Sequence, residues 1–123
     1  MRQWTWQVCT EFGWFQVPNA KHPMRSNFVG PQYWSPFCEA VFGAEYASEP
    51  KVDFYNELYG GLDIQGSNIV FANAIEDPWQ WAGMRQIHDP ATQSGMEAIL
   101  INCENCAHCV DLHTPSLTDA PTL

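Results

Sequence analysis

Two short runs of apolar, strand-forming residues are the features of this sequence that most restrict its fold. The first run, residues 67–72, leads to Asp77, and the second, residues 98–101, leads to His108. Such runs are typical of the buried strands of a parallel sheet. In sheets of this kind, functional side chains lie on loops at the carboxyl ends of the strands. The sequence therefore predicts an α/β fold that presents an acid, Asp77, and a base, His108, on two such loops.

The order of the acid and the base along the chain restricts the class of enzyme to which they could belong. In α/β hydrolases the nucleophile comes first, then the Asp, then the His. Asp77 and His108 follow this order, but no Gly-x-Ser-x-Gly elbow precedes them. The nearest serine, Ser67, begins a predicted strand rather than a strand-to-helix turn. We therefore expect two members of a catalytic triad here, without the nucleophile. The alternative for Asp77 is that the Asp-Pro pair only initiates a turn.

Charge and composition exclude several classes of function. The chain has 123 residues, of which 46% are hydrophobic and only 15% are charged, so it has enough apolar side chains for the core of one small domain. Its net charge is −9, with only five Lys and Arg residues. Nucleic acids and anionic membranes both need clustered basic residues, so neither is an expected partner. No apolar stretch reaches the length of a transmembrane helix, and no signal peptide opens the chain.

The cysteines indicate an oxidising compartment. Five cysteines are many for a cytosolic chain of this length, and the odd number leaves at least one free thiol. Three of them lie close to two histidines, in the cluster Cys103, Cys106, His108, Cys109 and His113. One interpretation of this cluster is a zinc site. The other is one local disulfide with one free thiol, and the sequence leaves both open.

Helices are expected mainly in the first half. Residues 4–9 are strand-prone, and the Pro-rich residues 18–36 read as a loop. Ser35 followed by Pro36 resembles a helix start, which predicts a helix from Pro36 to Ala47. A second helix is predicted over residues 52–59, because two glycines follow it.

The chain resembles the C-terminal part of the S28 family of serine peptidases. The resemblance is carried by four segments that occur in the family's order, namely Gln7–Phe15, Tyr59–Gly61, Ser67–Trp79 and Ala107–Leu112. It implies that Asp77 is the catalytic Asp and His108 the catalytic His. It further implies that Trp79 and Trp14 form walls of an apolar, proline-accepting pocket, and that Cys9 and Cys38 form a disulfide. The alternative for both tryptophans is that they are ordinary core residues.

The resemblance also implies a domain organisation and a function. Residues 1–61 would be the end of a helical cap (SKS-type) domain, and residues 62–123 the last core strands of an α/β-hydrolase domain. The intact protein would be a lysosomal, vesicular or secreted serine exopeptidase, either a carboxypeptidase or a dipeptidyl peptidase. It would cleave peptides next to proline or small apolar residues, need no cofactor, and be able to form a homodimer.

Two other interpretations follow from the missing nucleophile. A chain with the Asp and the His but no Ser cannot form an acyl-enzyme, so catalysis needs the N-terminal hydrolase portion. The chain could instead be a non-catalytic or zinc-stabilised binding module, or an inactive truncated product. Zinc binding and the sequence upstream of Met1 distinguish these interpretations.

Overall fold

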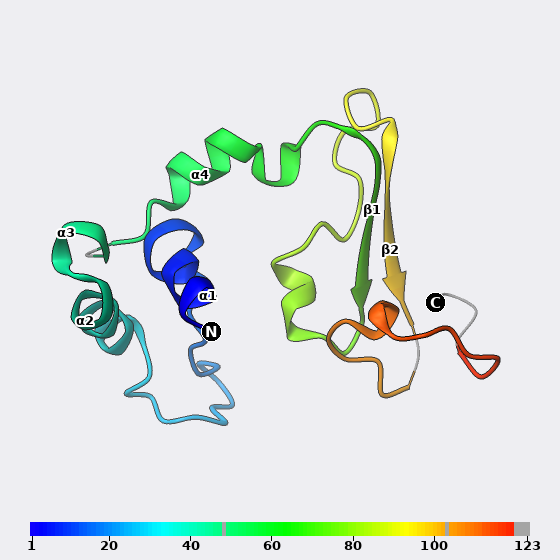
Figure 1. The fold of residues 1–123 in the computed structure, drawn as a ribbon. Coiled ribbons are helices and arrows are strands. Elements are labelled where there is room, and N and C mark those ends of the chain that lie inside the picture. The colour runs from blue at the N-terminus through cyan, green and yellow to red at the C-terminus, as the bar shows by residue number, and fades with distance from the viewer. Residues whose placement is uncertain (48, 103, 120–123) are drawn as a thin grey trace. The chain divides into compact units, whose positions relative to one another are not determined.

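The computed structural model describes residues 1–47, 49–102 and 104–119. The chain divides into two compact units, Met1–Gly61 and Leu62–Leu123. In the described residues, the first unit contains helices and the second contains a small parallel sheet (Figure 1). None of the helices in the described parts of the chain combines the length and the apolar character needed to span a membrane.

The first unit begins with a helix where the sequence suggested a strand. Helix α1 covers Arg2–Gln7 and continues into a π-helical segment, η1, at Val8–Phe12, so the expectation for residues 4–9 is wrong. The helix allows Thr10 Oγ1 to donate to the carbonyl of Trp6, one turn earlier, at 2.8 Å. Aromatic residues have only weak intrinsic preferences, and here their tertiary contacts decide the outcome. Trp6, for example, packs edge-on against Phe42 with 5.1 Å between ring centroids.

The next helix starts earlier than predicted. Helix α2 covers Pro31–Phe42 and the short helix α3 covers Ala44–Ala47. Pro31 occupies the helix start, and Pro36 lies inside α2, where a proline removes a backbone hydrogen bond. The expected single helix from Pro36 is therefore wrong at its start, and Gly43, with φ of 90°, separates the two helices at its other end.

The last helix of the first unit is confirmed. Helix α4 covers Val52–Tyr59, the range expected from the sequence. Gly60, in the left-handed conformation with φ of 91°, ends it, and its N–H bonds to the carbonyl of Asn56 at 2.8 Å. A residue without a Cβ adopts this conformation at little steric cost, which is why the glycine pair was an informative signal.

A disulfide forms the centre of the first unit. Cys9 and Cys38 are bonded, as the resemblance implied, and link η1 to α2 across 29 positions of sequence. Both are 1% exposed and pack with Ala47, and three partly buried phenylalanines surround them, namely Phe15, Phe37 and Phe42. The chain before α2 is held by Phe15, which stacks on Trp34 with 5.5 Å between centroids. The core of this unit therefore consists of a covalent link enclosed by aromatic rings.

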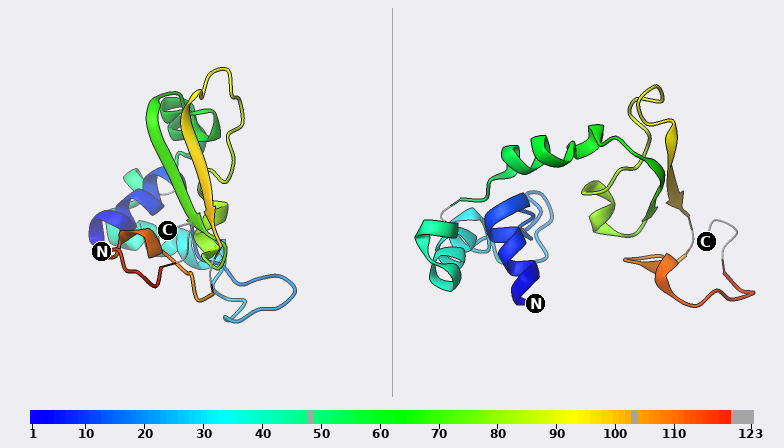
Figure 2. Two further views of the ribbon diagram at one scale, coloured as in Figure 1. Left: turned by 90° about the vertical axis from the view of Figure 1, so that its right-hand side faces the viewer. Right: turned by 45° about the horizontal axis from the view of Figure 1, so that its top comes forward.

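The second unit is built around two parallel strands. Strand β1 covers Ser67–Ala74 and β2 covers Gly95–Ile101, so both are longer at one end than expected. They pair in parallel, with Val70 opposite Glu97 and Ala74 opposite Ile101, and both views of Figure 2 show them side by side. The remaining elements are short 3₁₀ turns: η2 at Gly61–Asp63, η3 at Pro78–Trp81 and η4 at Val110–Leu112. Parallel pairing confirms this part of the sequence prediction.

The strands are less buried than the sequence suggested. Ala74 is the one buried residue of β1 and Ile101 the one buried residue of β2, both at the carboxyl ends. Val70, in the middle of β1, is 58% exposed. The prediction of buried strands is therefore wrong for this chain taken alone. Parallel sheets normally have both faces covered, whereas most residues of β1 and β2 are at least partly exposed here.

The polar connection between η3 and β2 is organised by one buried amide. Gln93 is 1% exposed, and its Nε2 donates to the carbonyls of Leu62 and Ile64, both at 3.0 Å. Its Oε1 accepts from the backbone N–H groups of His88 and Asp89, at 3.0 and 3.1 Å. All the hydrogen-bonding capacity of this side chain is thus used to join residues 86–95 to the start of the unit.

Candidate active site

Asp77 lies three residues after the end of β1 and serves two purposes at once. Its Oδ1 accepts from the backbone N–H of Trp79 at 2.8 Å, which caps the turn η3. Pro78 follows at the first position of the turn, where a proline is well tolerated. Its Oδ2 is left to face away from the turn and bonds to His108. Asp77 therefore initiates a turn through one oxygen and contacts His108 through the other, and its role as a catalytic acid stays a prediction.

The loop that carries His108 is fixed to the ends of both strands. Cys106 is 3% exposed and packs with Ala74 and Ile101, the last residues of β1 and β2. Val110, at the start of η4, packs on the same cluster. Residues on either side of His108 are thus anchored at the carboxyl ends of the strands, while the side chain of His108 itself is 62% exposed.

The structure brings Asp77 and His108 into direct contact. Nδ1 of His108 lies 2.6 Å from Oδ2 of Asp77, a short distance typical of a charge-assisted hydrogen bond. The carboxylate is buried, with its side chain 9% exposed. A carboxylate accepts the Nδ1 proton and so fixes the ring in the tautomer whose Nε2 is a free acceptor. Among the described residues, Nε2 has no recorded hydrogen bond, and the exposed ring makes it accessible to a proton donor.

Trp79 lies beside this pair. Its ring centroid is 6.5 Å from that of His108, at an angle of 45°. The ring is partly buried, so it provides an apolar wall at one side of the imidazole. The structure therefore brings together three of the four residues expected at the site, Asp77, His108 and Trp79.

Trp14 belongs to the first unit. It follows Gly13, which ends η1 in the left-handed conformation, and its side chain is 47% exposed. A Cβ on Gly13 would lie only 3.0 Å from the side chain of Pro50, so the segments that carry Gly13 and Pro50 pack closely together. The role of Trp14 as a pocket wall stays a prediction.

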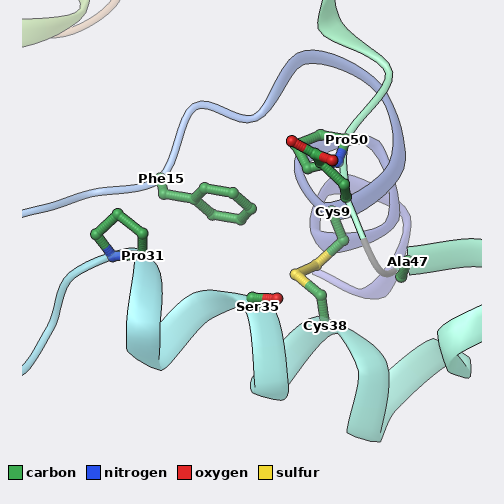
Figure 3. Close-up of a pocket in the computed structure, with 8 residues that line it drawn as sticks. Cys9, Phe15, Pro31, Ser35, Cys38, Ala47 and Pro50 are labelled. Atoms are coloured by element: carbon green, nitrogen blue, oxygen red, sulfur yellow. A yellow bond between two sulfur atoms is a disulfide. The ribbon is translucent and has the colours of Figure 1, made fainter.

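The first unit also contains a small cavity, of about 250 Å³. The Cys9–Cys38 disulfide borders it, together with Phe15, Pro31 and Pro50 (Figure 3). Ser35 and Glu49 supply its polar groups, and Ala47 completes the lining. The cavity is mainly apolar, and neither Asp77 nor His108 takes part in it.

Two side chains near Asp77 were not recognised in the sequence. Gln80, which is 7% exposed, donates from Nε2 to the carbonyl of Ile75 at 2.6 Å. Asn73 donates from Nδ2 to the carbonyl of Met84 at 2.9 Å. Together they fix the chain on both sides of Asp77. Polar residues flanking an Asp-Pro turn gave no distinctive sequence signal, because their partners are backbone groups brought near by the turn.

For the cysteine cluster, the structure favours the disulfide interpretation over the zinc interpretation. Cys106 is disulfide-bonded, and Cys109 is a free, exposed thiol. Cys103, another member of the proposed cluster, lies outside the described residues. A bonded sulfur has no thiolate to offer zinc. Within residues 1–47, 49–102 and 104–119, no group of three His, Cys, Asp or Glu side chains is arranged to hold a metal ion. The bonded state of Cys106 and the free thiol of Cys109 therefore agree better with the disulfide interpretation than with a zinc site.

A buried acid bonded to an exposed imidazole, at the carboxyl ends of parallel strands, is an arrangement that serves acyl-transfer hydrolases. The family model of serine carboxypeptidase S28 matches residues 1–123. The chain therefore belongs to the S28 family of serine peptidases, which implies an α/β-hydrolase-type fold. The full-length members of this family are enzymes that act on peptides.

Individual relatives agree with the family assignment. The chain is 34% identical to "Probable serine protease EDA2" of Arabidopsis thaliana, over 90% of this chain and 21% of that protein. It is 32% identical to human "Thymus-specific serine protease", over 99% of this chain and 23% of the relative. It is 29% identical to mouse "Lysosomal Pro-X carboxypeptidase", over 94% of this chain and 22% of the relative. No solved structure gives a significant match.

The chain thus spans less than a quarter of the length of these curated relatives. This proportion agrees with the presence of an acid and a base without a nucleophile elbow. It also agrees with the uncovered faces of the two-stranded sheet, because a parallel sheet of two strands needs additional layers.

Proposed function

We propose that Asp77 and His108 are the acid and the base of a Ser-His-Asp serine exopeptidase. The observation that carries this proposal is the 2.6 Å contact between His108 Nδ1 and Asp77 Oδ2, with Nε2 left exposed. The nucleophilic Ser would come from protein outside these 123 residues. Residues 1–61 would then be the end of the helical cap, and residues 62–123 the end of the hydrolase domain.

Each residue has a defined task in this mechanism. Nε2 of His108 takes the proton of the Ser hydroxyl as that oxygen attacks the scissile carbonyl carbon. The imidazolium that forms is stabilised by the buried carboxylate of Asp77, which stays ionised. His108 then donates the proton to the leaving amine, so the peptide bond breaks and an acyl-enzyme remains. Water, activated by the same imidazole, releases the acid product and regenerates the Ser.

Trp79 and Trp14 are proposed to accept a proline ring or a small apolar side chain next to the cleaved bond. The position of the Trp79 ring beside His108 supports this assignment. A rigid pyrrolidine has little conformational entropy to lose on binding, and an indole face offers a large apolar surface. Whether the enzyme trims the amino or the carboxyl end of peptides is decided by groups elsewhere in the protein.

We also propose a lysosomal, vesicular or secreted location. Two observations support it: the Cys9–Cys38 disulfide and the bonded state of Cys106. Disulfides persist in oxidising compartments. The names of two relatives, "Probable extracellular serine carboxypeptidase" and "Lysosomal Pro-X carboxypeptidase", point the same way. Homodimer formation by the full-length protein stays a prediction.

Replacement of the base tests the proposal directly. In the full-length protein, His108→Ala should lower kcat/KM for a Pro-containing peptide by at least about 10³-fold. The imidazole is largely exposed, so the thermal midpoint should change little. His113→Ala is a matched control, because His113 is an exposed histidine in the same region whose contacts among the described residues are with Thr114 and Asp119. Near wild-type turnover in His108→Ala would refute the assignment.

A further inference from the structure

The turn that carries Asp77 is tied to the sheet through Ile75. The N–H of Ile75 donates to the carbonyl of Ile101, the last residue of β2, at 3.0 Å. The carbonyl of Ile75 accepts from Nε2 of Gln80 at 2.6 Å. Ile75 therefore joins the end of the sheet to η3, and the bond on the side of η3 comes from the side chain of Gln80.

Gln80 also holds the backbone of Asp77. The N–H of Gln80 donates to the carbonyl of Asp77 at 3.1 Å, and the N–H of Asp77 donates to the carbonyl of Ala74, also at 3.1 Å. Both backbone groups of Asp77 are thus bonded, inside the ring that the Gln80 side chain closes onto Ile75. Gln80 is only 7% exposed, and a hydrogen bond shielded from water is stronger than an exposed one.

The loop of the base meets the sheet at the same residue as the turn of the acid. The side chain of Ile101, which is 2% exposed, packs with Cys106, two residues before His108. Ile101 therefore contacts the loop of the base through its side chain and the turn of the acid through its carbonyl. A displacement of Ile75 from Ile101 changes the position of Asp77 relative to His108. A contact of 2.6 Å between Oδ2 and Nδ1 tolerates little displacement.

We propose that Gln80 is a positioning residue of the candidate dyad. Its side chain sets the angle at which η3 leaves the strand, and so directs Oδ2 of Asp77 at Nδ1 of His108. Gln80 acts through Asp77 and need not touch the substrate. The inference rests on the proposed function, because a positioning role has a catalytic meaning only if the dyad is catalytic.

Replacement of Gln80 by methionine removes the donor and keeps the length of the side chain. In the full-length protein, Gln80→Met should lower kcat for a Pro-containing peptide by about 10- to 100-fold, because a displacement of about 1 Å in a catalytic group has an effect of this size. KM should change little, because the loss falls on the chemical step. Activity is measured well below the thermal midpoint of each variant, so that a loss of stability alone does not lower it.

Gln86→Met is the matched control, because Gln86 is an exposed glutamine in the connection that follows η3. This variant should keep the wild-type kcat. A wild-type kcat in Gln80→Met as well would overturn the proposal.

Replacement of Gln80 by glutamate gives a readout that a purely structural role would not. The introduced carboxyl has nearly the shape of the amide. When it is protonated, its O–H donates to the carbonyl of Ile75 in place of Nε2. When it is ionised, it has no proton to donate, and two oxygens face each other where the 2.6 Å bond was. The variant should therefore be active only in the protonated state of the introduced group.

The charges around this position favour the neutral form of the introduced carboxyl. The carboxylates of Glu76 and Asp77 lie in the same turn of chain, and β1 carries no charged residue. The imidazole of His108 is paired with Asp77, and the guanidinium of Arg85 lies over the ring of Trp81. Burial and neighbouring like charges both raise the pKa of a carboxyl, so we expect the introduced group to titrate above the ordinary range of a glutamate.

The kcat of Gln80→Glu is measured from about pH 5 to pH 8 and divided by the wild-type kcat at each pH, which removes the titration of His108 itself. This ratio should rise toward one as the pH falls, whereas the ratio for Gln80→Met should stay low and constant. A ratio for Gln80→Glu as low as that of Gln80→Met at every pH would overturn the proposal.

His108→Ala keeps the two possible failures apart. If His108→Ala is active, the proposed function fails and the positioning role fails with it. If His108→Ala is inactive while Gln80→Met has the wild-type kcat, the dyad stands and only the role of Gln80 is wrong.

Discussion

The two units of this chain are stabilised in different ways. The first unit encloses a disulfide, Cys9–Cys38, among phenylalanine rings. The second unit uses buried amides and a carboxylate to hold its loops, in addition to a small apolar cluster at the strand ends. The candidate dyad lies entirely in the second unit. The comparison shows that directional hydrogen bonds can hold the loops of a site even where the strands that carry it are partly exposed.

The two modes of stabilisation have different consequences. Burial of packed rings is largely non-directional, and a disulfide stabilises mainly by restricting the unfolded state. Asp77 accepts a hydrogen bond from a backbone N–H, and Gln80 and Asn73 donate to backbone carbonyls, and these bonds fix direction as well as position. Directional bonds are what an acid–base pair requires, because a small rotation of the imidazole breaks its alignment.

The largest expected effect is the loss of activity when Asp77, the buried carboxylate of the second unit, is replaced. Asp77→Asn in the full-length protein keeps an oxygen that can cap η3, but it removes the charge that stabilises the imidazolium. We expect kcat/KM to fall by about 10³- to 10⁴-fold with little change in thermal midpoint. Asp77→Ala, which also loses the cap, should show the same fall in activity plus a loss of stability of about 0.5–2 kcal/mol. Equal stability of the two variants would show that the cap contributes nothing.

The disulfide of the first unit should matter for stability rather than for the dyad. The double variant Cys9→Ala, Cys38→Ala should lose about 2–4 kcal/mol of unfolding free energy. Hydrogen exchange followed by mass spectrometry should show faster exchange in η1 and α2. Exchange at β1 and η3 should change less, and a uniform increase across both units would contradict the distinction drawn here.

Replacement of Gln93, the buried amide of the second unit, tests whether hydrogen bonds stabilise this unit. Gln93→Ala removes four hydrogen bonds and leaves the backbone carbonyls of Leu62 and Ile64 without their donor. We expect a destabilisation of about 1–3 kcal/mol, with faster hydrogen exchange over residues 86–95. Gln86→Ala is the matched control, because Gln86 is exposed in the same connection. If both variants behave alike, the buried amide does not organise this connection.

The smallest effect concerns a carboxylate of that connection. The Thr92 hydroxyl, which donates to Asp89 Oδ2 at 2.8 Å, and the N–H of Ala91 hold the pKa of Asp89 below its ordinary value. A lowered folded-state pKa contributes stability above the unfolded pKa, and that stability is lost as the pH falls through the folded value. Thr92→Val should therefore raise the pKa of Asp89 and weaken this pH dependence in acid. A carboxyl NMR titration measures the shift, and an unchanged pKa would contradict the assigned cause.

Much of the site could be predicted from the sequence, because its signals are local. An apolar run that ends at Asp-Pro places Asp77 at a turn, and the second run places His108 after a strand. The glycine pair after Tyr59 ended α4 where expected. Residues 4–9 and Pro36 were misjudged because aromatic contacts and the disulfide outweigh weak local preferences.

The sequence by itself determined the residue types of the dyad, their order and the two strands that carry them, since these depend on composition and periodicity along the chain. Only the tertiary structure decided that the two side chains meet at 2.6 Å, that Asp77 divides its oxygens between a cap and an imidazole, and that Cys106 rather than Cys109 is bonded. These outcomes depend on parallel pairing, which brings residues 31 positions apart to one edge of the sheet. No local pattern encodes such a distance, because it is fixed by contacts between segments rather than within them.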